Sequence, residues 1–297
     1  MRLFSRLLLL PAALGLIAPM AVEAGGEDNH KGHHDLGAAI EIIHNFTLVH
    51  DDIMDNDPIR RGRPAVHIAY DMPTAINAGD AMLALAFEMI AESTDIKDEV
   101  MRDLVRVIGR MVRKVSEGQQ MDMDFENRSD EVSEEEYITM ISGKTAAMFE
   151  TCAQTGAMLA GADNSIQETC RMWGLETGLC FQLMDDLIDI TGDTETLGKP
   201  AGSDVLEGKR TLMAIHALNQ DPVKLPTFHE IFGKGESGAD HLQQAISEMK
   251  SVGSLEYGKK RAMEHHAEAH RHLAKLENSQ AKSVLEGLTD WQLERMS

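Results

Sequence analysis

Apolar positions recur every three and four residues over most of the chain, which is the spacing of one helix face. The pattern is clearest between residues 74 and 199, where Ala, Met, Leu, Glu and Gln are frequent and proline does not occur. It predicts helices at 78–92, 103–126, 135–161, 239–252, 255–276 and 281–296. Loops are predicted at 25–35, 57–73, 191–206 and 220–239.

Strand signals are weak, because aromatic residues make up 4% of the chain and no alternating β-branched run occurs. A chain of 297 residues is long enough to bury one sizeable core, and it contains neither a short internal repeat nor a low-complexity linker. The sequence therefore predicts an all-α helical bundle in a single domain over residues 1–297.

The first 24 residues allow two interpretations. Two arginines, an apolar run and a small-x-small ending at Ala24 are typical of a secretory signal peptide. The same apolar run could equally form a buried core helix, so the pattern alone leaves the choice open.

Charge and cysteine content narrow the function. The net charge of −21 argues against a nucleic-acid or anionic-membrane partner. Cys152, Cys170 and Cys180 form neither a disulfide framework nor a zinc-binding spacing. We expect buried, reduced thiols and a cytoplasmic protein.

Two segments contain the spacing Asp-Asp-x-x-Asp. The first comprises Asp51, Asp52 and Asp55, and the second comprises Asp185, Asp186 and Asp189. On a helix the first and third aspartates of each motif lie one turn apart on the same face, where like charges are destabilising without a cation. Carboxylate oxygens suit Mg²⁺ bound together with substrate phosphates.

A solvated acidic face is the simpler alternative. Both motifs, however, lie in apolar surroundings, FTLVHDDIM and FQLMDDLID, that do not suit an exposed helix. An EF-hand is excluded for DDIMDND, because its glycine and closing glutamate are missing.

Basic residues follow each motif, although the chain contains only 28 of them. Arg60, Arg61 and Arg63 follow the first, Lys199, Lys209 and Arg210 follow the second, and Lys144 lies between them in SGKT. SGKT is not a phosphate-binding P-loop, because position 138 is Ile where that motif requires Gly. Carboxylates, metal ions and cationic side chains together indicate a diphosphate site.

These segments resemble those of the trans-polyprenyl diphosphate synthases. IIHNFTLVHDDIMDNDPIRRGRPAVH is similar to the first aspartate-rich motif of that family and FQLMDDLIDITGDTETLGKP to the second. GQQMD, SGKT and EGKR occur in the family order. From about Leu36 onward, the resemblance implies an all-α fold, usually dimeric, around a deep central cavity.

The resemblance also implies residue roles. Asp51, Asp55 and Asp185 would be the main ligands of three Mg²⁺ ions, supported by Asp52, Asp186 and Asp189. Arg60, Lys144 and Lys199 would hold an allylic diphosphate, with Lys209 nearby, while Arg61 and His44 would bind isopentenyl diphosphate. Thr145, Gln182 and Gln119 would line the site, with a further place for Asp122. The family joins the two substrates after ionisation of the allylic C–O bond, which requires no side-chain nucleophile.

The N-terminal region departs from the family. A Gly-Lys-x-x-Arg segment that binds isopentenyl diphosphate is missing, and Arg2 and Arg6 are the candidates for its remnant. The chain could be truncated, bind that substrate weakly, or be a subunit of a hetero-oligomer. The similarity of EAGGED to the family favours a divergent core helix and loop over residues 1–35, rather than a signal peptide.

Product length in the family depends on residues just before the first motif. Phe46 followed by Thr47 resembles the archaeal type of geranylgeranyl diphosphate synthase, which implies a C20 product ahead of C15 or C25. Ile43, Ala81 and Met82 are further candidates for the cavity wall. The alternatives are a non-catalytic subunit of a hetero-oligomeric synthase and a terpene cyclase, whose usual second motif is absent.

Histidines cluster in two places. One group lies at 30–34 and the other comprises His265, His266, His270 and His272. We interpret the first as a solvated loop and the second as the polar face of a helix, in preference to metal sites.

Overall fold

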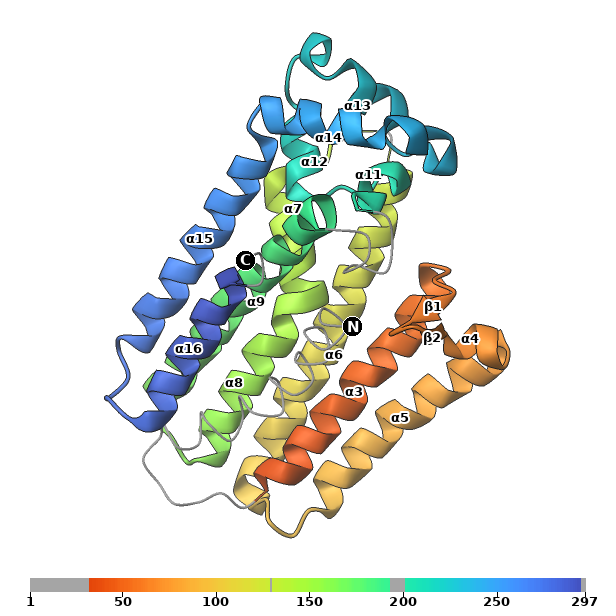
Figure 1. The fold of residues 1–297 in the computed structure, drawn as a ribbon. Coiled ribbons are helices and arrows are strands. Elements are labelled where there is room, and N and C mark those ends of the chain that lie inside the picture. Colours follow the sequence, from red (N-terminus) through yellow and green to blue (C-terminus); the bar gives the residue numbers. More distant parts are fainter. Residues whose placement is uncertain (1–31, 129, 193–200, 295–297) are drawn as a thin grey trace. The chain divides into compact units, whose positions relative to one another are not determined.

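The computed structural model describes residues 32–128, 130–192 and 201–294. The predicted core helix or signal peptide at residues 1–24 and the predicted diphosphate ligand Lys199 lie outside the described residues. The described chain is all-α apart from one two-stranded hairpin, so the predicted fold class is confirmed (Figure 1).

The chain divides into two compact units. Unit 1 comprises residues 1–113, 149–174 and 273–285, and unit 2 comprises residues 114–148, 175–272 and 286–297. The single domain expected from the sequence stays a prediction.

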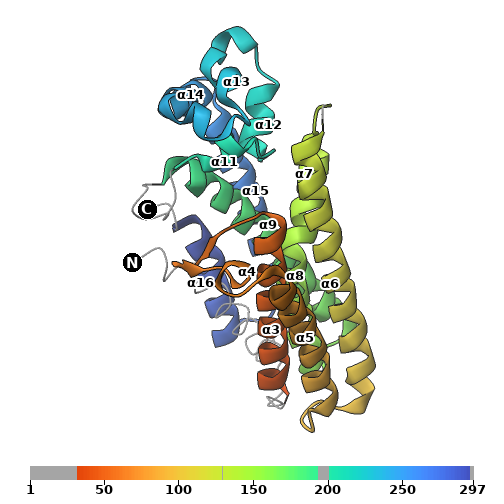
Figure 2. The same ribbon diagram turned by 90° about the vertical axis from the view of Figure 1, so that its right-hand side faces the viewer.

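Unit 1 is built from α3 (His33–Met54), β1 (Ile59–Arg60), β2 (Arg63–Pro64), α4 (Val66–Ala69), α5 (Met72–Glu92), and parts of α6 (Asp98–Asn127), α8 (Ala147–Leu159), α9 (Asn164–Thr191) and α16 (Gln280–Glu294). Helices α3 and α5 lie side by side in both ribbon views (Figures 1 and 2). The buried residues of α3 include Leu36, Ala39, Ile40 and Ile43, which recur at helical spacing. Gly79 on α5 allows close approach, because a Cβ there would lie 2.2 Å from His50 Nε2.

Unit 2 contains the rest of α6 and α9 together with α7 (Glu134–Ile141), η1 (Ser142–Ala146), α11 (Ser203–Glu207), α12 (Leu212–Leu218), η2 (Pro222–Lys224), α13 (Pro226–Ile231), η3 (Gly235–His241), α14 (Leu242–Ser251) and most of α15 (Ser254–Leu273). Its hydrophobic core includes Tyr137, Leu183, Met213, Phe228 and Met249. These side chains come from five helices that are dispersed along the sequence.

The predicted helical segments are confirmed in the described residues, but all four predicted loops contain regular structure, including the start of α11 in the loop predicted at 191–206. Residues 57–73 form the β1–β2 hairpin and α4. The loop predicted at 25–35 extends too far, because α3 already begins at His33. Proline indicates a loop at 220–239, but Pro226 is the first residue of α13. At that position a backbone N–H would have no partner within the helix, so proline is tolerated.

Candidate functional site

The first aspartate motif lies at the C-terminal end of α3. Asp51 and Asp52 are in its last turn, and Asp55 is the C-cap, whose backbone N–H donates to the Asp51 carbonyl at 2.8 Å. The helix therefore ends inside the motif. The last turn contains no basic residue, and the negative end of the helix dipole adds to the repulsion between the carboxylates. This arrangement requires cations from other elements.

Arg60 on β1 supplies one of them. Its Nε donates to Asp52 Oδ1 at 2.7 Å, and its Nη2 lies 3.7 Å from Asp51 Oδ2. Burial acts to lower the pKa of Arg60, but the hydrogen bond and charge of Asp52 outweigh it and raise that pKa overall. Asp52 is itself buried, so its carboxylate is held by Arg60, whereas Asp51 is half-buried and Asp55 is exposed.

Two further predicted site residues, Arg61 in the hairpin turn and His44 on α3, interact electrostatically. Arg61 and Gly62 both have positive φ, 53° and 72°, as a two-residue type I′ hairpin turn requires. His44 on α3 is buried, and its pKa is lowered to about 4, first by burial and then by the charges of Arg61 and Arg60. The imidazole is therefore neutral near pH 7 and lies within the electrostatic reach of both guanidinium groups.

The predicted product-length residues lie on α3, before the first motif. Phe46 is buried, and its ring packs edge-on against His50 with 5.0 Å between the centroids. The Thr47 hydroxyl donates to the His44 carbonyl at 2.8 Å. Of the two candidates for the cavity wall on α5, Met82 is half-buried but Ala81 is exposed.

The second motif lies in the last two turns of α9, which also has no basic residue in its final turn. Asp186 is buried and accepts hydrogen bonds from the Tyr137 hydroxyl at 2.5 Å and from Gln182 Nε2 at 2.8 Å. Gln182 in turn accepts from the Thr145 hydroxyl at 2.7 Å. Burial is the main cause that raises the pKa of Asp186 to about 7.

Lys144 and Thr145 lie in the π-helical segment η1, which interrupts the helix predicted at 135–161. Lys144 Nζ donates to Asp122 Oδ2 at 2.6 Å. Close packing of α6 on η1 makes this contact possible: a Cβ on Gly118 would lie only 2.2 Å from the Lys144 backbone nitrogen. Gly118 is thus a positioning residue. It belongs to the motif GQQMD, but the sequence alone did not indicate this role.

Lys209 lies in the same unit as the second motif. Its Nζ lies 3.8 Å from Asp204 Oδ2, and the charge of Asp204 is the main cause that raises the pKa of Lys209 well above its ordinary value. A pocket within unit 2 is formed by three basic residues together with carboxyl, hydroxyl, amide and apolar groups. Its lining residues are Asp122, Tyr137, Met140, Ile141, Lys144, Thr145, Gln182, Asp186, Lys209, Arg210 and Thr211.

Each unit therefore gathers one part of the predicted site. The unit 1 part comprises His44, Asp51, Asp52, Asp55, Arg60 and Arg61, and the unit 2 part comprises Asp122, Lys144, Thr145, Gln182, Asp185, Asp186, Asp189 and Lys209. Tyr137 and Asp204 were missed by sequence reasoning. Neither belongs to a recognised motif, and only the packing of α7 and α11 places them beside the second motif.

The donor chemistry of the two parts fits Mg²⁺. Each motif places carboxylate oxygens at a helix C-terminus, where a bound cation is favoured by the helix dipole as well as by the carboxylates. Asp51 and Asp55 in unit 1, and Asp185 in unit 2, are the more exposed members of their motifs. Neither motif contains cysteine or histidine, and the carboxylate oxygens suit a hard divalent ion.

Known proteins similar to this chain carry the names of one class of enzyme. The polyprenyl synthetase family model matches residues 12–249. A geranylgeranyl pyrophosphate synthase of Geoglobus acetivorans is 40% identical over 94% of this chain and 85% of its own length. A geranylfarnesyl diphosphate synthase of Natronomonas pharaonis is 37% identical over 86% of this chain and 73% of its own length.

Solved structures agree. The geranylgeranyl pyrophosphate synthetase of Pyrococcus horikoshii has a TM-score of 0.88 and 38% identity, covering 95% of this chain and 85% of the other. A polyprenyl synthase of Caulobacter crescentus, solved with calcium and isoprenyl diphosphate, has a TM-score of 0.85 and 31% identity, covering 96% of this chain and 85% of the other. The match of family, sequence and fold over nearly the whole chain shows that this protein belongs to the polyprenyl synthetase family.

Proposed function

We propose that this chain is a trans-prenyltransferase that condenses isopentenyl diphosphate head-to-tail with an allylic diphosphate to give geranylgeranyl diphosphate. Membership of the polyprenyl synthetase family supports the enzyme class. The observation that supports the mechanism is the pair of aspartate motifs, each at a helix C-terminus and each beside cationic side chains.

Asp51, Asp55 and Asp185 would hold Mg²⁺, in a set of three ions. The bound ions would neutralise charge that develops on the departing diphosphate. Asp52 and Asp186 act as supports, since Arg60 and Tyr137 already hold their carboxylates. Asp189 would support the same cluster from the last turn of α9.

The cationic side chains would bind the diphosphates. Lys144 and Lys209 line the unit 2 pocket and would hold the allylic diphosphate, together with Arg60 and Lys199. Arg61 and the neutral His44 would bind isopentenyl diphosphate. Positive charge placed where the leaving group becomes negative favours ionisation of the allylic C–O bond. The isopentenyl double bond then attacks the cation, and the released diphosphate takes up the proton whose loss restores an alkene.

One incubation tests this function. The purified chain is mixed with Mg²⁺, isopentenyl diphosphate and farnesyl diphosphate, and the products are analysed by mass spectrometry. A C20 diphosphate made by the chain alone, and lost with EDTA or in Asp51→Asn, supports the proposal. A cyclic hydrocarbon would indicate a terpene cyclase, and product only after addition of a partner subunit would indicate a non-catalytic subunit.

We also propose a cytoplasmic homodimer with α5 at its interface. Met72, Ile76 and Leu85 on this helix are exposed, with relative accessibilities of 53%, 41% and 44%. A second copy is the occupant that we propose for these exposed apolar side chains. The composition of α5 would also allow it to cross a membrane, but Asp80, Glu88 and Glu92 interrupt its apolar surface. The three buried free cysteines suit the reducing cytoplasm.

A further inference from the structure

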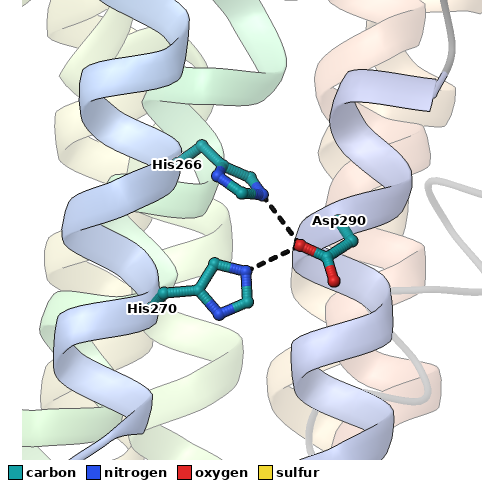
Figure 3. Close-up of side chains that lie close together, drawn as sticks. All are labelled: His266, His270 and Asp290. Carbon is teal, nitrogen blue, oxygen red and sulfur yellow. Dashed lines mark hydrogen bonds and ion pairs between the residues drawn. The ribbon is translucent and has the colours of Figure 1, made fainter.

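Two histidines and one aspartate converge on the surface of unit 2, outside the pocket that contains the second motif. His266 and His270 lie one turn apart on α15, and Asp290 lies on α16 (Figure 3). Their Nε2 atoms are 3.0 and 2.8 Å from the same oxygen, Asp290 Oδ1. The two imidazole rings meet edge to face at 4.7 Å.

The three ligand atoms have the spacing of a metal site. All lie within 4.8 Å of one another. For metal–ligand bonds of about 2.1 Å, adjacent ligand atoms in an octahedral site are about 3.0 Å apart, and those in a tetrahedral site are about 3.4 Å apart. The two nitrogen–oxygen distances, 3.0 and 2.8 Å, are therefore close to those around a single ion.

We propose that His266, His270 and Asp290 bind one first-row transition metal ion, with Zn²⁺ as the representative ion. Two histidines at positions i and i+4 of a helix present their Nε2 atoms to one point, as in established zinc sites. Two imidazoles and one carboxylate favour Zn²⁺ and its neighbours over Mg²⁺, which prefers oxygen ligands alone. The site is thus chemically distinct from the aspartate motifs.

The surroundings fit such an ion. Asp290 is 56% exposed and the two histidine side chains are 18% and 32% exposed, so solvent can reach the site and water can complete the coordination. The net charge of −21 raises the concentration of cations near the protein. A bound ion would join α15 to the C-terminal helix α16, and its role is structural.

The sequence alone favoured a polar helix face here, and a metal-free hydrogen-bonded contact between α15 and α16 is the competing interpretation. Titration calorimetry with Zn²⁺ separates the two. The full chain is first stripped with EDTA and then titrated in excess Mg²⁺, so that the aspartate motifs are occupied by Mg²⁺. We expect one Zn²⁺ per chain, with affinity at least tenfold weaker in His270→Gln and in Asp290→Asn.

His241→Gln is the matched control, because His241 is an exposed histidine outside the cluster, and Zn²⁺ binding should be unchanged in it. Co²⁺ provides a second readout: wild type should develop a visible absorption band that His266→Gln lacks. Circular dichroism checks that each variant is folded, and Asp290→Asn, at an exposed position, serves if a histidine variant unfolds. Absence of Zn²⁺ binding in wild type, or equal binding in all variants, would overturn the proposal.

Discussion

At the scale of single residues, Tyr137 supports Asp186 of the second motif, although no sequence motif contains Tyr137. Its hydroxyl donates to Asp186 in a fully buried environment, where a carboxylate without its donor is costly. Tyr137→Phe removes that donor while keeping the ring in the core. We expect kcat to fall about tenfold, in line with a loss of roughly 1–2 kcal/mol. Steady-state kinetics measure this, and Tyr70→Phe, at a 76% exposed position, should leave kcat unchanged.

His44 gives a prediction about pH. Its pKa is about 4 in the folded protein, against 6.5 ordinarily, chiefly because it is buried. The unfolded chain therefore binds a proton at a higher pH than the folded chain does, and stability is lost as the pH falls from about 6.5 to about 4. The shift corresponds to roughly 3 kcal/mol.

Urea unfolding at pH 7 and pH 4.5 measures the effect. His44→Gln cannot take up this proton, so its stability should decline less over the same interval. His241→Gln, at an exposed position, should decline like wild type. Equal pH dependence in all three proteins would contradict the role assigned to His44.

Phe46 provides a residue-scale test of product length. Its buried ring lies on α3, five residues before Asp51. If the ring blocks the growing prenyl chain, Phe46→Ala opens space and should move the main product from C20 to C25 or longer. Chromatography of the dephosphorylated products measures the distribution. The same product lengths at normal turnover would remove Phe46 as the determinant.

At the scale of elements, the crossing of α6 over η1 fixes the position of Lys144. Gly118 is the point of closest approach, and Gly143 packs against it from η1, where a Cβ would lie 3.2 Å from Gly118 Cα. The π-helical turn then directs Lys144 towards Asp122, one helical turn beyond Gly118. The positions of Lys144 and Thr145 in SGKT thus depend on the two glycines, Gly118 and Gly143.

Gly118→Ala tests this crossing. The added methyl group would meet backbone atoms, so we expect about 1–3 kcal/mol of destabilisation and a weaker affinity for the allylic diphosphate. Gly109→Ala on the same helix is the control: no atom lies within 4 Å of its added Cβ, and alanine favours the helix by about 1 kcal/mol. Thermal unfolding and KM measure both effects. Similar stability changes in the two variants would contradict the tight crossing.

At the scale of the whole molecule, α5 determines the proposed assembly. Leu85→Glu replaces an exposed apolar side chain of this helix with a charge, and the resulting desolvation cost should convert the homodimer to monomers. Light scattering after size-exclusion chromatography measures the mass. Val223→Glu, at an 84% exposed position on η2, should leave the dimer intact. A monomeric wild-type protein would rule out the assembly.

The sequence by itself determined the helical class, the positions of six helical segments and the two aspartate motifs, because helical periodicity and charge spacing are local properties. The bounds of α3 and α9, which contain the motifs, were not among its predicted helices. Its local signals failed at residues 57–73 and 220–239, where a hairpin and a proline-initiated helix replace predicted loops. It also contained nothing that marked Tyr137, Asp204 or the π-helical turn at Lys144.

Those features were decided by tertiary packing. Tyr137 is 49 residues from Asp186, and Asp290 is more than 20 residues from His266, so only the folded chain brings each pair within hydrogen-bonding distance. The same packing buries Asp186 and His44 and thereby sets their pKa values, since the cost of a buried charge depends on the surrounding atoms rather than on neighbours in the sequence.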